Sequence, residues 1–282
     1  MTKTVFEIKY AVPGAGQKAL HRTRNKGFAM IKLVCSDIDN TLVKGDAGNE
    51  VLRKLKARGV LPMLATGRPA ADVFRLFPEA KDNTVVASYD GAIVSIGGTV
   101  ISDRPIDGNI VNAFFDSFPK SGLSGCSLIF YTADDCYIIG ESAAKALENA
   151  ETMIGRTKRI DDPRGIPSKI YKISVYSDTD RDFDYLFADW ESYLSCVYRR
   201  GNWCEFVSSG TDKGYALSIV MEKFVLGRDE VIAFGDGEND FTMLEVAGCS
   251  YAIEGSPAAR EEKADFVTGD AVRTINELVL KD

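Results

Sequence analysis

Residues 31–43 read IKLVCSDIDNTLV, and the expected fold depends on this stretch. The apolar run Leu33-Val34-Cys35 is short enough for a buried strand, and two carboxylates, Asp37 and Asp39, follow it with one residue between them. An ionised carboxylate beside a protein core needs a cation or a hydrogen-bond partner. In open parallel sheets, ligands bind at the carboxyl ends of the strands. The stretch therefore favours a metal-dependent site around the two aspartates, although D-x-D after a strand also occurs in ordinary polar loops.

Composition narrows the class of protein. The chain has 282 residues, of which 45% are hydrophobic, and this suits one large domain or two smaller ones with a substantial core. A formal net charge of -7 argues against nucleic acid or an anionic membrane surface as the main partner. No apolar run approaches the ~18 residues of a membrane span. The six cysteines include no C-x-x-C pair, and we expect a reducing, cytoplasmic compartment.

The first 30 residues differ from the rest of the chain. Their basic residues face a single acid, Glu7, and Pro13-Gly14 interrupts the segment. The segment lacks the apolar stretch of a secretory signal. A mitochondrial targeting peptide is an open alternative, although the segment contains no serine. We interpret residues 1–30 as an N-terminal extension that activity does not require. The only histidine, His21, lies here, so histidine chemistry is not expected.

Strand patterns and helix patterns alternate in the first and last parts of the chain, and the region between them has a different pattern. The alternation over residues 31–106 and 208–282 predicts an α/β fold, in which a Rossmann-like parallel sheet is covered by helices on both faces. Residues 107–207 mix short strands with helices and predict an inserted α+β unit. Gly97-Gly98, between two apolar runs, predicts a hairpin at the end of the first part. Within the inserted unit we expect helices near 110–118, 143–153 and 183–190, and strands near 127–131, 137–139, 170–176, 197–199 and 203–207.

Polar clusters follow three of the expected strands, and a lysine, Lys213, begins a later helix. The clusters are Asp37/Asp39, Thr66/Gly67/Arg68 and Asp236/Asn239/Asp240. In a parallel sheet these strand ends share one edge. Gathered carboxylates repel one another unless a cation is present, and ligation by oxygen alone points to Mg²⁺ rather than zinc. A lysine, a threonine hydroxyl and turn amides can hold the oxygens of a phosphate.

Four motifs in this order resemble those of the haloacid dehalogenase superfamily phosphatases, of the Cof-like group with a type-IIB cap. The first motif, D-x-D-x-T, matches Asp37–Thr41, and the second matches Thr66–Arg68. The third, a lysine that opens a helix after the cap, matches Lys213-Gly214, and the fourth, G-D-G-x-N-D, matches Gly235–Asp240. The resemblance covers residues 31–282. It implies a catalytic core with the inserted α+β unit as a cap domain.

The resemblance also implies the catalytic and metal-binding residues. Asp37 would be the nucleophile that forms an aspartyl-phosphate, and Asp39 would be the general acid for the leaving group and then the base that activates water. The acid role needs a raised pKa. Mg²⁺ would bind the carboxylates of Asp37 and Asp236 and the backbone carbonyl of Asp39. Asp240 would hold the water shell of the metal or Lys213.

The remaining motif residues would bind the substrate. Thr66 and Lys213 would neutralise and orient the phosphoryl oxygens, with amides of the turn at Gly67, and Asn239 would orient the phosphate. Arg68 has two open interpretations, which are contact with substrate or cap and a structural ion pair. We expect Thr41 to fix the Asp39 loop rather than to touch substrate.

Three positions depart from the family pattern. Asn40 stands where glycine is usual, and asparagine tolerates a left-handed backbone. Asp90 stands where asparagine is common before Gly-Ala, and an extra carboxylate there disfavours some anionic substrates. Glu254-Gly255-Ser256 replaces a Gly-Asn-Ala sequence and adds an acid near the rim.

The sequence thus predicts a Mg²⁺-dependent phosphomonoester hydrolase. Its substrate would be a small phosphorylated metabolite, such as a sugar phosphate, a nucleotide or a phosphorylated cofactor, and it would be a monomer or homodimer. A phosphomutase of the same superfamily and a non-catalytic ligand-binding protein on this fold are the alternatives. Neither nucleic acid nor a membrane is expected as a partner. The sequence does not identify the ester, because specificity lies in cap loops.

Overall fold

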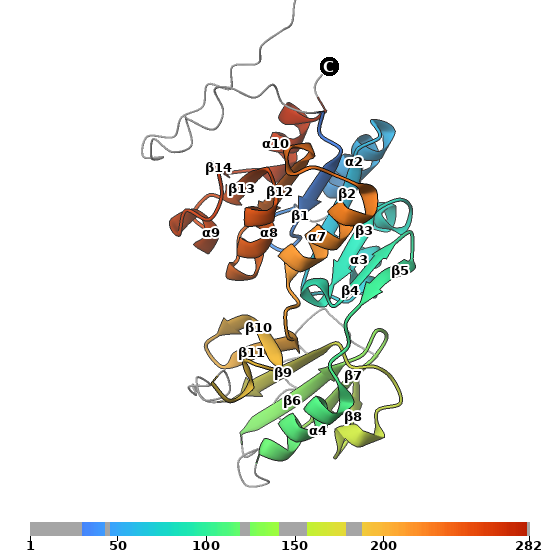
Figure 1. Ribbon diagram of the computed structural model, residues 1–282, viewed down its shortest axis with the longest axis vertical. Coiled ribbons are helices and arrows are strands. Elements are labelled where there is room, and N and C mark those ends of the chain that lie inside the picture. The colour runs from blue at the N-terminus through green and yellow to red at the C-terminus, as the bar shows by residue number, and fades with distance from the viewer. Residues whose placement is uncertain (1–29, 43–45, 119–124, 141–156, 179–187, 281–282) are drawn as a thin grey trace, which may run out of the picture.

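The computed structural model describes residues 30–42, 46–118, 125–140, 157–178 and 188–280 (Figure 1). The predicted extension at residues 1–29, the expected helix near 143–153 and most of the expected helix near 183–190 lie outside the described residues. The described residues contain two β-sheets. In the part of the chain that the structure covers, no helix has the length and apolar character needed to cross a membrane.

The larger sheet has eight strands in the order β14-β13-β12-β1-β2-β3-β4-β5. Every neighbouring pair from β14 to β3 is parallel, whereas β4 and β5 run antiparallel to their neighbours. This confirms the predicted α/β class with a sheet rich in parallel strands. The strands are β1 (Leu33–Ser36), β2 (Leu61–Ala65), β3 (Val85–Ser88), β4 (Ile93–Ile96), β5 (Thr99–Asp103), β12 (Val231–Gly235), β13 (Cys249–Ile253) and β14 (Phe266–Thr268). The hairpin predicted at Gly97-Gly98 joins β4 to β5, and both glycines have positive φ.

Helices cover both faces of this sheet because its central strands are apolar on both sides. Leu33 and Cys35 of β1 pack with the residues of α7, α8 and α9 on one face. Val34, between them, packs on the other face with α2, α3 and α10. All three side chains are almost completely buried. The helices are α2 (Asp46–Ala57), α3 (Ala70–Leu76), α7 (Lys213–Phe224), α8 (Phe241–Val246), α9 (Pro257–Arg260) and α10 (Ala271–Leu278).

The smaller sheet has six strands in the order β10-β11-β9-β6-β7-β8, and only its β7–β8 pair is parallel. Its strands are β6 (Cys126–Tyr131), β7 (Cys136–Ile139), β8 (Thr157–Arg159), β9 (Lys172–Ser177), β10 (Leu194–Arg200) and β11 (Trp203–Ser208). The helix α4 (Gly108–Ser117) packs on one face of this sheet, where the ring of Phe114 lies 5.6 Å from that of Phe206. We call the part from α4 to β11 the second-sheet region. It lies beyond one end of the larger sheet in Figure 1.

A short turn after β3 of the larger sheet packs against the second-sheet region. Tyr89 follows β3, and its ring packs among apolar side chains of the second-sheet region. The ring stacks against Tyr171 at 6.5 Å, and the hydroxyl donates a hydrogen bond to the carbonyl oxygen of Thr132 at 2.8 Å. The residue after Tyr89 is Asp90, so this turn connects the second-sheet region with the ends of the central strands.

Candidate active site

The polar clusters of the sequence meet at one edge of the larger sheet. The strand β1 lies between β12 and β2, and the three are parallel. Asp37, Thr66 and Asp236 each come directly after one of these strands. The backbone amide of Asp37 donates to the carbonyl oxygen of Phe234 at 2.9 Å, which continues the β1–β12 pairing beyond the strand. Adjacent parallel strands therefore bring together residues that lie up to about 200 positions apart.

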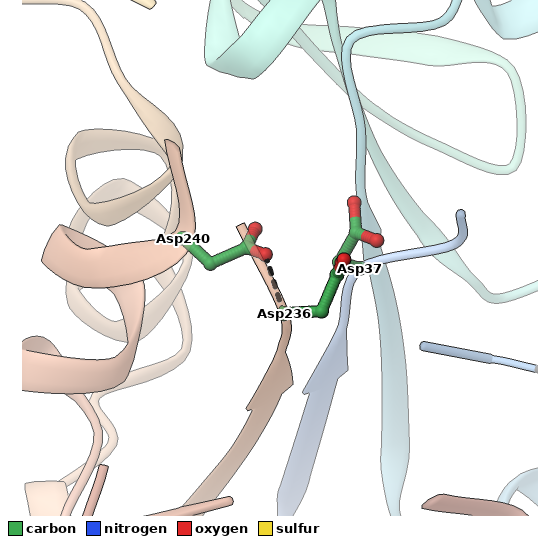
Figure 2. Close-up of side chains that lie close together, drawn as sticks. All are labelled: Asp37, Asp236 and Asp240. Carbon is green, nitrogen blue, oxygen red and sulfur yellow. Dashed lines mark hydrogen bonds between the residues drawn. The ribbon is translucent and has the colours of Figure 1, made fainter. Parts of the chain in front are cut away.

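Three carboxylates form an acidic cluster at this edge. Asp37, Asp236 and Asp240 each offer an oxygen, and these oxygens lie within 4.8 Å of one another (Figure 2). Burial raises the pKa of Asp37 well above its ordinary value, although the nearby Lys213 ammonium lowers it. Burial and then the charge of Asp240 raise the pKa of Asp236. An all-oxygen cluster of mutually repelling carboxylates is the donor set that suits a hard divalent cation.

Lys213 neutralises part of this cluster. Its ammonium group donates to Oδ1 of Asp37 and to Oδ1 of Asp240, both at 2.6 Å, and the side chain is only 1% exposed. Lys213 is the first residue of α7, where Asp212 caps the helix by accepting from the amide of Tyr215. Burial lowers the pKa of Lys213, but the two carboxylates outweigh this effect and raise the pKa well above its usual range. Lys213 is thus a fixed buried cation.

Asp240 uses both of its oxygens within the protein. Oδ1 accepts from Lys213, while Oδ2 accepts from the backbone amides of Asp236 and Gly237 at 2.8 and 2.9 Å. A side chain at Gly235 would come within 2.6 Å of the Asp240 side chain, so only glycine fits there. Asp240 therefore holds Lys213 and the loop that carries Asp236. Asp37 accepts from Lys213 through Oδ1, and Asp236 accepts from Thr41 through Oδ1.

Asp39 forms an ion pair with Arg68 and is not part of the acidic cluster. Its two carboxylate oxygens accept from Nε and Nη2 of Arg68, each at 2.7 Å. Of the two interpretations left open for Arg68, the structure contains the ion pair. A bidentate guanidinium favours the ionised form of a carboxylate. For Asp39 to donate a proton to a leaving group, this pair has to open first.

Three other sequence features have simple structural outcomes. Asn40 lies at φ 61°, the left-handed conformation for which asparagine was expected to substitute for glycine. Glu254 is exposed, and its amide donates to the carbonyl oxygen of Thr268. Thr41, which we expected to fix the Asp39 loop, donates from its hydroxyl to Oδ1 of Asp236 at 3.1 Å.

Asp90 lies inside the site. Its backbone amide donates to the carbonyl oxygen of Thr66 at 2.9 Å, and its Oδ1 accepts from the side-chain amide of Asn239 at 2.9 Å. A Cβ atom at Gly67 would lie 3.1 Å from Oδ2 of Asp90. The amide group of Asn239, which was expected to orient a phosphate, is therefore engaged with Asp90. This residue stood out in the sequence only as a departure from the motif.

Lys172 belongs to the site and was missed by the sequence analysis. It begins β9 in the second-sheet region, and its ammonium donates to the carbonyl oxygen of Gly67 and to Oε2 of Glu205, both at 2.9 Å. The ammonium also lies 4.9 Å from the ring centre of Tyr131, and the side chain is buried. The signal that could have found it is a lysine inside an otherwise apolar strand, since a buried lysine needs a partner.

A family model described as haloacid dehalogenase-like hydrolase matches residues 34–273. The chain belongs to this family. The match confirms the family resemblance drawn from the four motifs, and it covers both sheets.

Relatives and solved structures extend the likeness over most of the hydrolase. A phosphoglycolate phosphatase from Thermoplasma volcanium is 25% identical over 245 residues, which are 85% of this chain and 92% of the relative. A Streptococcus pyogenes protein, whose name pairs a phosphatase with a peptidyl-prolyl cis-trans isomerase, is 25% identical over 84% of this chain, which spans 51% of that longer protein. The structure of phosphatase BT1666 from Bacteroides thetaiotaomicron has a TM-score of 0.75 at 20% identity, covering 88% of this chain and 95% of that chain.

We expect Lys172→Met to destabilise the hydrolase by about 3 kcal/mol, because it leaves the largely buried Glu205 carboxylate without its cation. The free energy of unfolding from chemical denaturation is the measurement. Lys169→Met is the matched control, since Lys169 pairs with Asp103 at 2.7 Å but is exposed. The control should lose less than about 1 kcal/mol. Equal losses in the two variants would contradict the role given to Lys172.

Proposed function

We propose that this hydrolase cleaves phosphomonoesters of small metabolites with Mg²⁺ and through an aspartyl-phosphate on Asp37. The observation that carries the proposal is the arrangement around Lys213, whose buried ammonium contacts Asp37 while Asp236 lies beside it. A carboxylate nucleophile, a fixed cation and an acidic cluster are the parts that phosphoryl transfer needs. The Thermoplasma volcanium relative of matching length is named a phosphatase, and the Bacteroides thetaiotaomicron protein of similar fold is described among phosphatases.

The residues of the acidic cluster fit the metal. The carboxylates of Asp37 and Asp236 and the backbone carbonyl of Asp39 would hold Mg²⁺, as the family resemblance implies. Oxygens of Asp37 and Asp236 already lie within 4.8 Å of one another, close enough to share one ion. The bound ion would withdraw charge from the phosphoryl oxygens and favour the ionised form of Asp37. Asp240 supports the site indirectly, through Lys213 and the amides of the Asp236 loop.

In the proposed reaction, Asp37 attacks phosphorus, and Asp39 is the general acid and then the general base. Lys213 keeps a positive charge next to Asp37 and so opposes the effect of burial on its ionisation. Asp39 is held by Arg68 as an ionised carboxylate, which suits the base that activates water in the second step. Opening of the Asp39–Arg68 pair when substrate binds would allow Asp39 to take up a proton from solvent. It would then donate this proton to the leaving oxygen as the bond from phosphorus to that oxygen breaks.

The phosphate would lie between α7 and the turn after β2. Lys213, the hydroxyl of Thr66 and the amides of the Gly67 turn offer donors and positive charge there, and Thr66 is almost completely buried. Phosphoryl transfer depends chiefly on such positioning and electrostatic stabilisation. In the resting arrangement the Thr66 hydroxyl accepts from the amide of Arg68 at 3.2 Å, which leaves its own proton available for a phosphoryl oxygen.

Residues 107–207 would act as a cap that covers the site and selects the leaving group. Lys172 of this region contacts the Gly67 turn, and Tyr131 lies beside Lys172, so both are candidates to contact the part of the substrate beyond the phosphate. A cap that excludes bulk water strengthens the electrostatic interactions of the site. Sugar phosphates, nucleotides and phosphorylated cofactors are the substrate classes to test.

Release of inorganic phosphate from a panel of phosphorylated metabolites tests the proposal. With Mg²⁺ we expect turnover of at least one ester, and with a chelator we expect the rate to fall by roughly 100-fold or more, because the acidic cluster is then uncompensated. Transfer of phosphate to a second position on a sugar, without release, would indicate a phosphomutase. Binding without turnover of any ester by folded, metal-loaded protein would contradict the proposal and favour a binding protein.

A further inference from the structure

Asp90 carries a buried oxygen for which the described residues provide no hydrogen bond. The residue is 1% exposed. Its Oδ1 accepts from Asn239, but its Oδ2 has no hydrogen-bond partner in the part of the chain that is described. Leaving a buried polar atom unpartnered costs about 1–3 kcal/mol. An isolated buried atom of this kind, inside a site, indicates that a ligand supplies the missing partner.

The backbone fixes this oxygen against the turn that we propose holds the phosphate. Tyr89 and Asp90 both have positive φ, 50° and 54°, which is unusual for side-chain-bearing residues and especially for tyrosine. The amides of these two residues donate to the carbonyl oxygens of Arg68 and Thr66. The position of a Cβ at Gly67 would be 3.1 Å from Oδ2. Strained backbone that is held this firmly next to a site is a reason to look for function.

Four groups face the Asp90 carboxyl from the elements around it. Lys213 on α7 and Lys172 on β9 carry positive charge, Glu205 on β11 carries negative charge, and Asn239 donates its amide. Both lysines are already committed, Lys213 to two carboxylates and Lys172 to Glu205 and Gly67. Burial raises the pKa of Asp90 despite the two lysines. A phosphate dianion placed beside this carboxyl would favour its neutral form further.

We propose that Asp90 is a further phosphate-binding residue, which holds a proton on Oδ2 and donates it in a hydrogen bond to a phosphoryl oxygen. Because Oδ1 accepts from Asn239, Oδ2 is the oxygen that carries the proton. The inference rests on the proposed function, since it places phosphate at the turn of Thr66 and Gly67. A protonated Asp90 carries no negative charge, so this additional carboxyl group would not repel an anionic ligand. Phosphate binding should also weaken as the pH rises, because ionised Asp90 cannot donate.

Calorimetric titration of the full chain with inorganic phosphate, in the presence of Mg²⁺, tests this assignment from about pH 5.5 to about pH 9. Asp90→Asn keeps a donor that does not titrate, and asparagine tolerates positive φ. The ratio of the dissociation constant of the wild type to that of Asp90→Asn should rise with pH, by up to about tenfold per pH unit above the pKa of Asp90. The titration of phosphate itself cancels in this ratio.

Two further variants complete the test. Asp90→Gly accepts the left-handed backbone but has no donor, and at the acidic end it should bind phosphate about tenfold more weakly than the wild type. Asp135→Asn, which removes a partly exposed carboxylate paired with Lys158, should follow the wild type at every pH. Asp90→Gly binding phosphate as tightly as the wild type at the acidic end would overturn the assignment, and so would a ratio that falls as the pH rises. Ester turnover by the wild type, measured alongside, tests the proposed function separately.

Discussion

Asp37→Asn is expected to abolish phosphate release from every ester that the wild type hydrolyses, with a loss in kcat of roughly 10⁴-fold or more. A neutral amide oxygen is a poor nucleophile, so the aspartyl-phosphate cannot form. The fold should persist, because the amide has nearly the shape of the carboxylate and Lys213 keeps its contact with Asp240 at 2.6 Å. The loss therefore reports on chemistry rather than on folding.

The measurement is phosphate release under saturating substrate with Mg²⁺, together with a thermal melt of each protein. Asp135→Asn is the matched control, because it makes the same chemical change at an exposed ion pair of the second-sheet region. The control should retain the wild-type rate. An Asp37→Asn protein with a rate within about tenfold of the wild type would show that Asp37 is not the nucleophile.

Lys213→Met is expected to lower kcat/KM by roughly 10³-fold and to destabilise the protein by about 3 kcal/mol near neutral pH. The substitution removes the fixed cation of the phosphate site. It also leaves the buried carboxylates of Asp37 and Asp240 facing each other without the ammonium that contacts both. Breaking a buried ion pair by removing one partner leaves an uncompensated charge, and this explains the size of the effect.

The loss of stability in Lys213→Met should depend on pH. Burial already raises the pKa of Asp37 in the folded wild type, and removal of the ammonium that lowers it would raise this pKa further. A carboxyl whose pKa is raised in the folded state contributes stability below its unfolded pKa and loses that contribution as the pH rises through the folded pKa. Destabilisation should thus be small in acid and should grow towards neutral pH.

Urea denaturation over a pH series, with and without Mg²⁺, measures this effect. The divalent cation should restore part of the lost stability, since it brings positive charge to the same carboxylates. Lys158→Met removes an exposed lysine of the second-sheet region and should change stability by less than about 1 kcal/mol at every pH. A Lys213→Met protein as stable as the wild type at neutral pH would contradict the buried ion-pair arrangement.

Local patterns in the sequence were sufficient to predict the larger sheet and the motifs at its edge. Leu33, Val34 and Cys35 are apolar in succession, which is typical of a strand buried on both faces, and the structure packs them that way. The class α/β and the membership of the family both follow from such short-range signals. The left-handed backbone at Asn40 could also be predicted, because it depends on the conformational preference of one residue.

Side-chain partners that lie far apart in the sequence could not be predicted in this way. The sequence left Arg68 with two interpretations, and the ion pair with Asp39 follows only from how the β1 and β2 loops lie together. Asn239 was expected to orient phosphate, yet its amide group contacts Asp90, 149 positions away along the chain. Hydrogen bonds act over a few ångströms, so their partners are decided by the packing of whole elements.

The sequence by itself determined which residues form the central strands, which polar residues follow them, and hence the family and the class of chemistry. Short-range preferences and strand periodicity are enough for this, because they act on neighbouring residues. Only the tertiary structure decided that Lys172 reaches the Gly67 turn from another sheet and that one oxygen of Asp90 is buried without a hydrogen-bond partner among the described residues. Both depend on the exclusion of water and on contacts between distant segments, and neither exists before the chain has folded.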